Sequence, residues 1–346
     1  MEKPLLTIFL LCHNSERFLE KTLKSILGQT YSNFELILSD NYSEDKTPEI
    51  IKSFQKNNEN IIYCRNEKPE LSDQDYIGCY SNYNACIKSN LIKGNFVAFC
   101  HDDDIYNKNI FEKEINFLIN NPEAGAVFTM ANKINREDNL VGSFKLPKDL
   151  KGKRVYNFAD IFKSLLYYGN NFLITPTFFA RTNVLKDVGL FNENKFRTSA
   201  DLEMWLKILE KYPIGIINEK LINYRVGRGG KIYQRSRTKR SDYFLVMDHY
   251  FKKAKTSLKI EDKFLRQYEY QKYFDDTLLA MNFLTKNQIE EAKKMINKPF
   301  SPNISRAFFE NISLLRIKVF ILKLIMLICI NIGLGRYLGR LYQFFH

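Results

Sequence analysis

The hydrophobic positions in the first part of the chain follow two alternating patterns. Short, largely apolar runs that predict strands occupy residues 5–12, 34–38, 61–64, 96–100 and 126–130, and the first of them is typical of a strand covered on both faces. Segments with helical spacing separate these runs, near residues 18–27, from Thr47, and near residues 76–89 and 108–120. Strands that alternate with helices in this way predict a mainly parallel sheet with helices on both faces.

The pattern changes after about residue 130. Residues 131–230 are less regular, with a helix expected over 158–167, an apolar run over 172–180 and a helix beginning near Asp201. From about residue 236 onward the pattern is helical, and glycines at 227, 229 and 230 precede it. We therefore expect an α/β domain over 1–230, in halves of 1–130 and 131–230, and a helical region over 231–346.

The last segment, residues 312–346, combines apolar and basic residues. Residues 319–334 are almost entirely apolar, interrupted by Lys323 and Asn331, and this run is shorter than the roughly 20 residues of a spanning helix. The run is flanked by the basic residues Arg316, Lys318, Arg336 and Arg340. This composition predicts a helix in the membrane interface with its basic residues toward anionic lipid. The alternative is a buried core helix or a dimer helix.

Polar side chains stand where three of the predicted strands end. They are His13 and Asn14, Asp40 and Asn41, and the acids at 102–104. Because functional groups of parallel sheets gather beyond the carboxyl ends of the strands, this convergence predicts a site. Taken alone, a residue such as Asp40 is equally well explained as a turn former.

The run His101-Asp102-Asp103-Asp104 follows the apolar residues 96–100 with no loop between them. Three consecutive carboxylates repel one another and contribute nothing to a core, so a cation is expected to balance them. Mg²⁺ and Mn²⁺ prefer oxygen ligands and often share them with substrate phosphates. The alternative is an acidic, solvated turn before the next helix.

Composition narrows the function classes. The 346 residues are 45% hydrophobic and 26% charged, which is typical of a globular protein. The net charge of +13 suits an acidic partner, and the basic residues concentrate between Arg225 and Arg240. Six scattered cysteines without a CxxC pair indicate reduced thiols, and the apolar stretch near the N-terminus is typical of a first strand. The first strand is not followed by a glycine-rich turn, which argues against dinucleotide and P-loop enzymes.

Four blocks of the chain resemble the inverting nucleotide-sugar glycosyltransferases of the GT-A fold, sequence family 2. The likeness extends over residues 4–228, about two thirds of the chain. The blocks are Leu5–Asn14 with Ser25–Thr30 and Phe34–Thr47, then Gly94–Asp104, then Leu185–Asn192 with Ala200–Leu206, and finally Tyr224–Val226. The resemblance implies a GT-A fold, with a nucleotide-binding half over 1–130 and an acceptor-binding half over 131–230.

The resemblance also implies roles for residues in these blocks. The nucleotide pocket is expected to be lined by Cys12, His13, Asn14, Glu16, Asp40 and Asn41. Among these, Asp40 would accept a hydrogen bond from the base, with uracil as the expected base.

The metal and the general base are implied in the same way. Asp104 and Asp103 would ligate a Mn²⁺ or Mg²⁺ ion that bridges the diphosphate, and Asp102, near the ribose, is a third candidate ligand. Asp201 would take the proton of the acceptor hydroxyl. The alternative for Asp201 is a cap on the helix that begins there.

The chain departs from the family pattern at three places. His101 stands where many relatives have an acid, and Ala200 stands where they have a glutamate. Gly227 occupies the place of a histidine that approaches the diphosphate in many relatives, so Arg228 or Arg225 could supply positive charge there instead.

These observations predict a metal-dependent inverting glycosyltransferase. It would move a sugar, expected to be UDP-linked in the donor, to a hydroxyl of a glycan or lipid-linked glycan during synthesis of a surface polysaccharide such as lipopolysaccharide. We expect it to be cytoplasmic and peripherally bound to the anionic inner face of the cell membrane. The alternatives are a nucleic-acid-binding protein, suggested by the charge, and an inactive sugar-nucleotide binder; no RNA-recognition motif or zinc spacing supports the former.

Overall fold

The computed structural model describes residues 3–67, 78–227 and 237–345. The chain divides into two compact units, which we call the sheet unit (residues 1–162 and 170–227) and the helical unit (residues 163–169 and 228–346). Each unit is described by itself below. The domain boundaries expected from the sequence stay a prediction.

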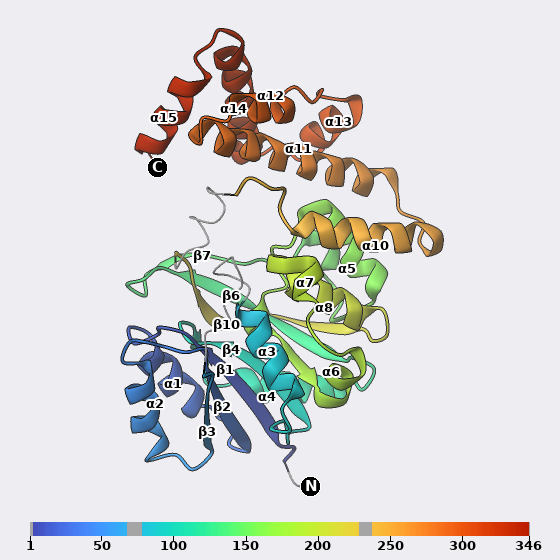
Figure 1. Ribbon diagram of the computed structural model, residues 1–346. Helices are drawn as coiled ribbons and strands as arrows, with labels where there is room; N and C mark the ends of the chain where they lie inside the picture. Colours follow the sequence, from blue (N-terminus) through green and yellow to red (C-terminus); the bar gives the residue numbers. More distant parts are fainter. Residues whose placement is uncertain (1–2, 68–77, 228–236, 346) are drawn as a thin grey trace. The chain divides into compact units, whose positions relative to one another are not determined.

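The sheet unit is built on one mixed sheet with the strand order β3-β2-β1-β4-β9-β6-β10-β5, with β7 beside β6 and β8 beside β10 (Figure 1). The strands are β1 Leu6–Cys12, β2 Phe34–Asp40, β3 Ile61–Arg65, β4 Phe96–His101, β5 Ile105–Tyr106, β6 Ala126–Ile134, β7 Leu140–Ser143, β8 Val155–Tyr156, β9 Phe179–Arg181 and β10 Ile214–Arg225.

Helices accompany the strands in the expected alternation. They are α1 Leu19–Leu27, α2 Thr47–Gln55, α3 Gly78–Lys88, α4 Ile110–Asn120, α5 Phe158–Tyr168, α6 Thr182–Val188, α7 Glu193–Phe196 and α8 Ala200–Leu209. Of α5, residues 163–168 belong to the helical unit. Three short 3₁₀ turns are η1 Lys148–Leu150, η2 Thr175–Thr177 and η3 Arg197–Ser199.

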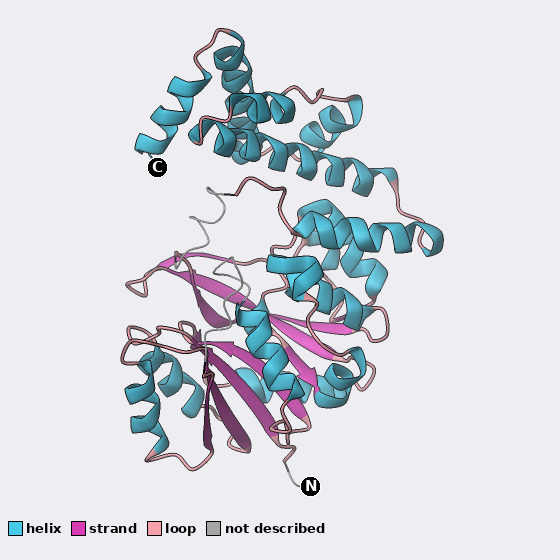
Figure 2. Cartoon of the chain, in the orientation of Figure 1, coloured by secondary structure: helices cyan, strands magenta, loops and turns pink. Residues whose placement is uncertain are grey.

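The direction of the strands differs from the sequence expectation in one respect. The strands β3, β2, β1 and β4 are all parallel, as predicted. However, the short strand β9 lies antiparallel between β4 and β6, so the sheet is mixed. The α/β architecture with helices on both sides of the strands is confirmed (Figure 2).

The two faces of β1 show why its apolar run is continuous. Leu6, Ile8 and Leu10 join the core that also contains the apolar side of α1. Phe9 points to the opposite face, where its ring stacks on Phe99 of β4 at 5.9 Å. Because successive side chains of a strand alternate between faces, a strand buried on both sides is apolar at most positions. The exception in β1 is the buried Thr7, whose hydroxyl donates a hydrogen bond to Glu35 Oε1 at 2.6 Å.

The second face carries an aromatic cluster under the carboxyl end of β4. Tyr83 of α3 packs on Phe99 with ring centroids 4.4 Å apart, and Trp205 of α8 packs on Phe178 at 4.1 Å. Trp205 and Tyr83 are fully buried. This cluster anchors α3 and α8, the two helices that later contribute to the site.

The helical unit contains α10 Tyr243–Ser257, α11 Asp262–Thr285, α12 Ile289–Ile296, α13 Pro302–Glu310, α14 Leu314–Asn331 and α15 Gly335–Phe345. Its main core lies where α11, α12, α14 and α15 meet, around Leu284 and Met326. α15 approaches α11 closely, since a Cβ on Gly339 would overlap the Leu284 carbonyl. Among the described residues, every helix is too short or too polar to cross a membrane.

Two arginines at the described start of the helical unit form internal ion pairs. Arg237 forms a bidentate pair with Asp275 of α11, at 2.5 and 3.2 Å. Arg240 pairs with Asp276 of the same helix, which also accepts a hydrogen bond from Lys298 at 2.7 Å. These arginines connect the start of the unit to its central helix.

The close contact between β10 and α4 yields a stability prediction. A Cβ on Gly215 would lie 2.1 Å from the Phe117 ring, so Gly215→Ala must displace the ring and should lower stability by about 1–3 kcal/mol. Urea unfolding followed by the fluorescence of Trp205, the single tryptophan, reports the sheet unit alone. In a Phe117→Leu background the added loss should be smaller, and equal losses in both backgrounds would contradict this contact.

Candidate active site

The three aspartates after β4 form a turn, here called the acid turn (Asp102–Asp104), that is held by hydrogen bonds from three directions. Asp102 is nearly buried, and its Oδ2 accepts hydrogen bonds from the His13 backbone N–H (3.0 Å) and from the Ser15 hydroxyl. This carboxylate therefore fixes the loop after β1 to the end of β4.

Thr22 of α1 holds the acid turn from below. Its hydroxyl lies 2.8 Å from the carbonyl oxygen of Asp104 and 3.0 Å from that of Asp102. Thr22 is fully buried on the apolar side of α1, between Leu19 and Ile26. A polar residue on a buried helix face needs a hydrogen-bond partner, and the acid turn supplies it.

Arg225, the last residue of β10, holds the turn from the third direction. Its backbone N–H donates to Asp104 Oδ1 at 2.8 Å, and its Nε donates to the Asp103 carbonyl at 2.8 Å. The guanidinium also forms an ion pair with Asp138 at 2.6 Å, and only 1% of the side chain is exposed. The idea that Arg225 supplies charge to a leaving group is therefore not supported, because its side chain is buried and already bonded to the Asp103 carbonyl and to Asp138.

Asp104 keeps one oxygen without a protein partner. It is fully buried, and Oδ2 has no hydrogen-bond partner among the described residues. Burial raises the pKa of this carboxyl well above its usual range, and the neighbouring Asp103 raises it further, while the Arg225 N–H acts in the opposite direction. A buried carboxylate oxygen with no partner is costly unless a cation completes it.

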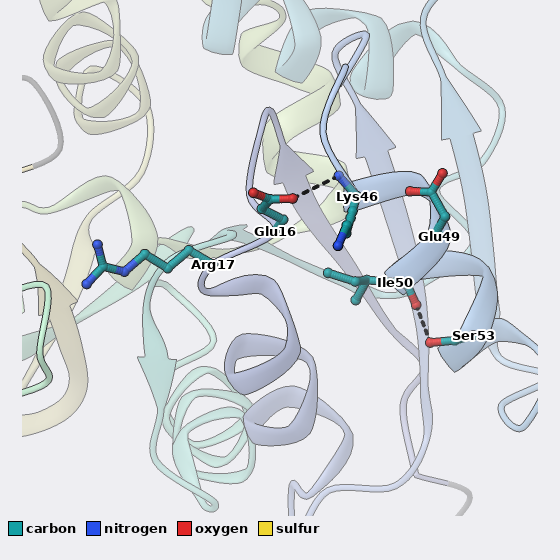
Figure 3. A pocket seen from close by; sticks show the side chains of 6 residues that line it. All are labelled: Glu16, Arg17, Lys46, Glu49, Ile50 and Ser53. Atoms are coloured by element: carbon teal, nitrogen blue, oxygen red, sulfur yellow. Dashed lines mark hydrogen bonds between the residues drawn. The ribbon is translucent and has the colours of Figure 1, made fainter.

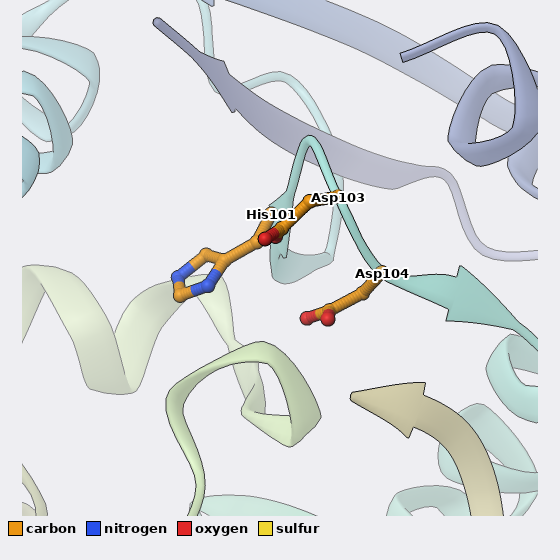
Figure 4. A group of neighbouring side chains, drawn as sticks. All are labelled: His101, Asp103 and Asp104. Carbon is orange, nitrogen blue, oxygen red and sulfur yellow. The ribbon is translucent and has the colours of Figure 1, made fainter. Parts of the chain in front are cut away.

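Three side chains, including that of Asp104 itself, lie close enough together to bind such a cation. Ligand atoms of His101, Asp103 and Asp104, here called the cation group, all lie within 4.8 Å of one another. Figure 4 shows the imidazole and both carboxylates extending to the same side of the turn. Two carboxylates and an imidazole suit a divalent ion such as Mn²⁺, so the residues present fit the expected metal. Asp102 is not part of this group, because its carboxylate holds the β1 loop.

The loops after β1 and β2 are joined by several hydrogen bonds. His13 Nδ1 lies 2.9 Å from the Asn41 carbonyl oxygen, and the Asn41 N–H donates to the Cys12 carbonyl. Asn14, at a φ of +48°, donates from its backbone to the Ser43 hydroxyl and accepts from the Glu44 N–H. The predicted nucleotide residues of the two loops are thus brought together at one edge of the sheet.

Asp40 is fully buried between neighbouring groups. Its Oδ1 accepts from the Ser43 N–H at 2.9 Å, and its Oδ2 accepts from the Tyr63 hydroxyl at 2.8 Å. Arg65 Nε lies 3.6 Å from the same oxygen. Its expected contact with a nucleotide base stays a prediction.

Two other predicted nucleotide residues lie differently from the rest. The Cys12 side chain is buried in the core beneath α1, and its expected contact with a nucleotide stays a prediction. Glu16 accepts a hydrogen bond from the Lys46 N–H and lines an open pocket of about 620 Å³ at the starts of α1 and α2 (Figure 3). None of the residues lining that pocket belongs to the acid turn.

Asp201 lies in the first turn of α8 but is not its N-cap, which is Ser199. Its Oδ2 accepts a hydrogen bond from the Thr175 hydroxyl at 2.8 Å, and its Oδ1 accepts from the Leu202 N–H. Burial raises the pKa of Asp201, and the Thr175 hydrogen bond lowers it in part. A carboxylate with a raised pKa is a better proton acceptor than a solvated one.

Helix α3 connects Asp201 to the acid turn. Cys79 lies near Asp201: burial raises the pKa of its thiol to about 12, and the Asp201 carboxylate contributes to the rise. Tyr83, one helical turn later, stacks on His101 with ring centroids 6.4 Å apart. Because residues four apart share a helix face, the proposed base and the cation group border the same face of α3.

Some of the residues that hold the site together were not found from the sequence. Ser15 and Thr22 hold the acid turn, and Thr175 holds Asp201. Thr22 carried a usable signal, a polar residue on an apolar helix face, whereas nothing in the sequence near Thr175 indicated its partner. Arg228, a predicted nucleotide residue, lies outside the described residues.

Several known proteins are similar to this chain in sequence. The family model described as glycosyl transferase family 2 matches residues 7–189. An uncharacterized glycosyltransferase of Methanocaldococcus jannaschii is 26% identical over 72% of this chain and 81% of that protein. TuaG of Bacillus subtilis, a putative teichuronic acid biosynthesis glycosyltransferase, is 25% identical over 65% of this chain and 80% of that protein.

Solved structures share the fold. A crystal structure of S. aureus TarS 1–349 with UDP has a TM-score of 0.55 at 16% identity, covering 99% of this chain and 92% of that one. The chain spans 55% of a longer TarS chain. A Pyrobaculum calidifontis mannosyltransferase in complex with GDP-Man and Mn²⁺ has a TM-score of 0.53 at 14% identity, covering 97% and 85%.

The match covers more than half of the chain, and it includes the acid turn and the loops that the structure brings beside it. The chain therefore belongs to glycosyl transferase family 2 and is a glycosyltransferase of the GT-A fold.

Proposed function

We propose that this enzyme transfers a sugar from a nucleotide-diphosphate sugar to a hydroxyl of a glycan or lipid-linked glycan, with inversion and with help from a divalent metal. The observation that carries the proposal is the buried Asp104 oxygen without a partner, grouped with Asp103 and His101. A buried group of this kind at the edge where the β1 and β2 loops meet suits a cation-bound diphosphate.

The donor would bind along the carboxyl ends of β1, β2 and β4. His101, Asp103 and Asp104 would hold Mn²⁺ or Mg²⁺, which when bound neutralises charge on the departing diphosphate. His13, Asn14 and Asn41 would contact the nucleoside. We propose UDP as the nucleotide because TarS, which shares the fold, has been crystallised with UDP and with UDP-GlcNAc.

Asp201 would act as the general base. Its carboxylate takes the proton of the acceptor hydroxyl while that oxygen bonds to the anomeric carbon and the bond to the diphosphate breaks on the opposite face. Proton removal by a positioned base contributes roughly 10²–10⁴-fold to a rate. One base and one displacement invert the anomeric centre, and no nucleophilic carboxylate is needed.

The alternatives have less support. The basic run expected to contact nucleic acid includes Arg225, which is buried, and Arg237 and Arg240, which pair with acids of α11. Measuring sugar transfer together with donor binding distinguishes an enzyme from an inactive sugar-nucleotide binder.

The exposed surface of the helical unit supports the expectation that the protein binds a membrane. We define the outer face of α14 as its exposed apolar residues, Leu314, Leu315, Ile317, Ile321, Leu324, Ile325 and Ile328. The opposite side packs in the unit, so this helix is both a core helix and an exposed one. Between Ile321 and Ile328 every exposed position is apolar.

The charge distribution of α14 is the reverse of an ordinary surface helix. Lys323, the charged residue in the middle of the apolar run, points inward, where its Nζ donates to the Lys298 carbonyl and lies 4.0 Å from the Tyr273 ring. Burial lowers the pKa of Lys323 to about 8. A helix that turns its charge inward and its apolar residues outward suits an apolar environment outside.

We propose that the outer face of α14 lies in the interface of an anionic membrane on the cytoplasmic side. Residues 311–346 contain no acid, and the exposed Lys318, Arg336 and Arg340 are available for anionic head groups. An acceptor carried on a lipid would then be delivered at the same surface.

Replacing Asp201 tests the chemistry. Asp201→Asn keeps the shape of the side chain and its bond to Thr175 but cannot take a proton, so the transfer rate should fall by roughly 10²–10⁴-fold. The affinity for the donor, measured by calorimetry, should change little, because Asp201 is not in the cation group. Transfer at the wild-type rate would remove Asp201 as the base.

The hydrogen bond from Thr175 should appear in the pH profile of transfer. Asp201 is active as a carboxylate, so the rate falls as the pH drops through its raised pKa. Thr175→Val removes a bond that lowers this pKa, so the acid limb should move to higher pH, while Thr175→Ser should leave it in place. Cys79 and Tyr80 of α3 face the same carboxyl and are unchanged in both variants. An acid limb that does not move in Thr175→Val would contradict the assignment.

The membrane proposal is tested by cosedimentation with vesicles. Ile321, Ile325 and Ile328 are 48%, 42% and 59% exposed, and changing all three to Gln should weaken binding at least about thirtyfold, given roughly 1.5–3 kcal/mol per fully buried aliphatic side chain. The matched control changes Ile119, Leu140 and Val141, exposed apolar residues of the sheet unit, to Gln.

Two results would overturn the membrane proposal. Binding should be tighter to vesicles of phosphatidylglycerol with phosphatidylcholine than to phosphatidylcholine alone, and an absence of binding to both contradicts it. A dimer in light scattering that the same three substitutions dissociate would show instead that a second copy covers this face.

A further inference from the structure

The cation group contains an imidazole beside its two carboxylates, and the structure shows how this ring is held. His101 is the last residue of β4, two positions after Phe99. Because side chains alternate along a strand, His101 and Phe99 point to the same face of the sheet, toward α3. Tyr83 of α3 contacts both rings, at 4.4 Å for Phe99 and 6.4 Å for His101.

The backbone of His101 is held as well. Its N–H donates to the Tyr106 hydroxyl at 2.9 Å, and Tyr106 is almost fully buried beside α1. With the ring beside Tyr83 at an interplanar angle of 25°, the imidazole is oriented before any ion arrives. Fixed orientation by neighbouring groups is a common property of metal-binding histidines.

The other members of the group fix the donor set. Asp102 is engaged by the His13 N–H and the Ser15 hydroxyl, whereas Asp104 Oδ2 is buried and has no protein partner. Ligand atoms of His101, Asp103 and Asp104 lie within 4.8 Å of one another (Figure 4). The protein therefore offers one nitrogen and two carboxylates rather than an all-oxygen set.

We propose that His101 ligates the divalent cation and makes this site select a first-row transition ion, such as Mn²⁺, over Mg²⁺. Mg²⁺ is a hard ion that binds oxygen ligands and keeps its water shell, while affinity for imidazole rises along the transition series. An imidazole at this position also avoids adding a fourth carboxylate to the three acids of the turn. This inference rests on the proposed cation site and adds to it the residue that determines metal preference.

The test is metal binding by the full-length protein, with no turnover required. Mn²⁺ affinity is measured by electron paramagnetic resonance, and Mg²⁺ affinity by its competition with Mn²⁺. Wild-type protein with bound Mn²⁺ should show magnetic coupling to an imidazole ¹⁴N nucleus. His101→Asp should lose this coupling and lower the ratio of Mn²⁺ to Mg²⁺ affinity at least about tenfold. The matched control is His249→Asn, which removes an imidazole from α10 of the helical unit.

The variants separate failure of this inference from failure of the proposed function. Asp104→Asn should abolish Mn²⁺ binding. If it does so while His101→Asp keeps the wild-type ratio of Mn²⁺ to Mg²⁺ affinity, His101 is not a ligand and the cation site stands without it. The same conclusion follows if the ¹⁴N coupling is absent from wild type. If wild type binds no Mn²⁺, or if Asp104→Asn binds it as tightly as wild type does, the cation site itself is wrong and this inference falls with it.

Discussion

Three consecutive aspartates at the end of a buried strand are the constraint around which the sheet unit is organised. The carboxylates of Asp102 and Asp104 are held in different ways. Asp102 accepts two hydrogen bonds from the β1 loop, while Asp104 accepts one from the end of β10 and keeps a second oxygen without a protein partner. The backbone of the turn is held from α1 by Thr22 and from β10 by Arg225. Elements from both halves of the sheet unit are therefore needed to place one short turn.

The same principle explains where the positive charge goes. In the described part of the basic run, three arginines pair with acids: Arg225 with Asp138, Arg237 with Asp275, and Arg240 with Asp276. Removing one partner of such a pair leaves an uncompensated charge, so these arginines are structural. The net charge of +13 is consequently a poor guide to a nucleic-acid partner, and the acid-free segment after residue 310 is a better guide to an anionic surface.

Much of the fold could be predicted from the sequence because its strands are covered on both faces. A strand such as Leu6–Cys12 is then apolar at every position except Thr7, which is a strong local signal. The orientation of β9 could not be predicted, because three residues carry no information about direction. Ser15 is of a residue type that often caps helices, yet the N-cap of α1 is Phe18, and the Ser15 side chain bonds to Asp102, which is distant in sequence.

The candidate site was predictable in part for a similar reason. The acid turn and the ends of β1 and β2 are local patterns, so their residues could be named in advance. Thr175 and Asp201 are 26 positions apart, and only the packing of η2 against β4 and β6 brings the first of them to the second. The orientation of Lys323 could not be predicted from the hydrophobic pattern. A charged residue in an apolar helix is expected to face water, whereas Lys323 faces the core.

The central claim is that the acid turn binds a nucleotide sugar through a divalent cation. Calorimetric titration with UDP-linked sugars, with and without Mn²⁺, on wild type and Asp104→Asn tests it most directly, because asparagine keeps an acceptor for the Arg225 N–H while removing the charge. The account predicts binding that requires both the ion and the Asp104 carboxylate. Equal donor affinity with and without Mn²⁺, or in the variant and the wild type, would contradict it.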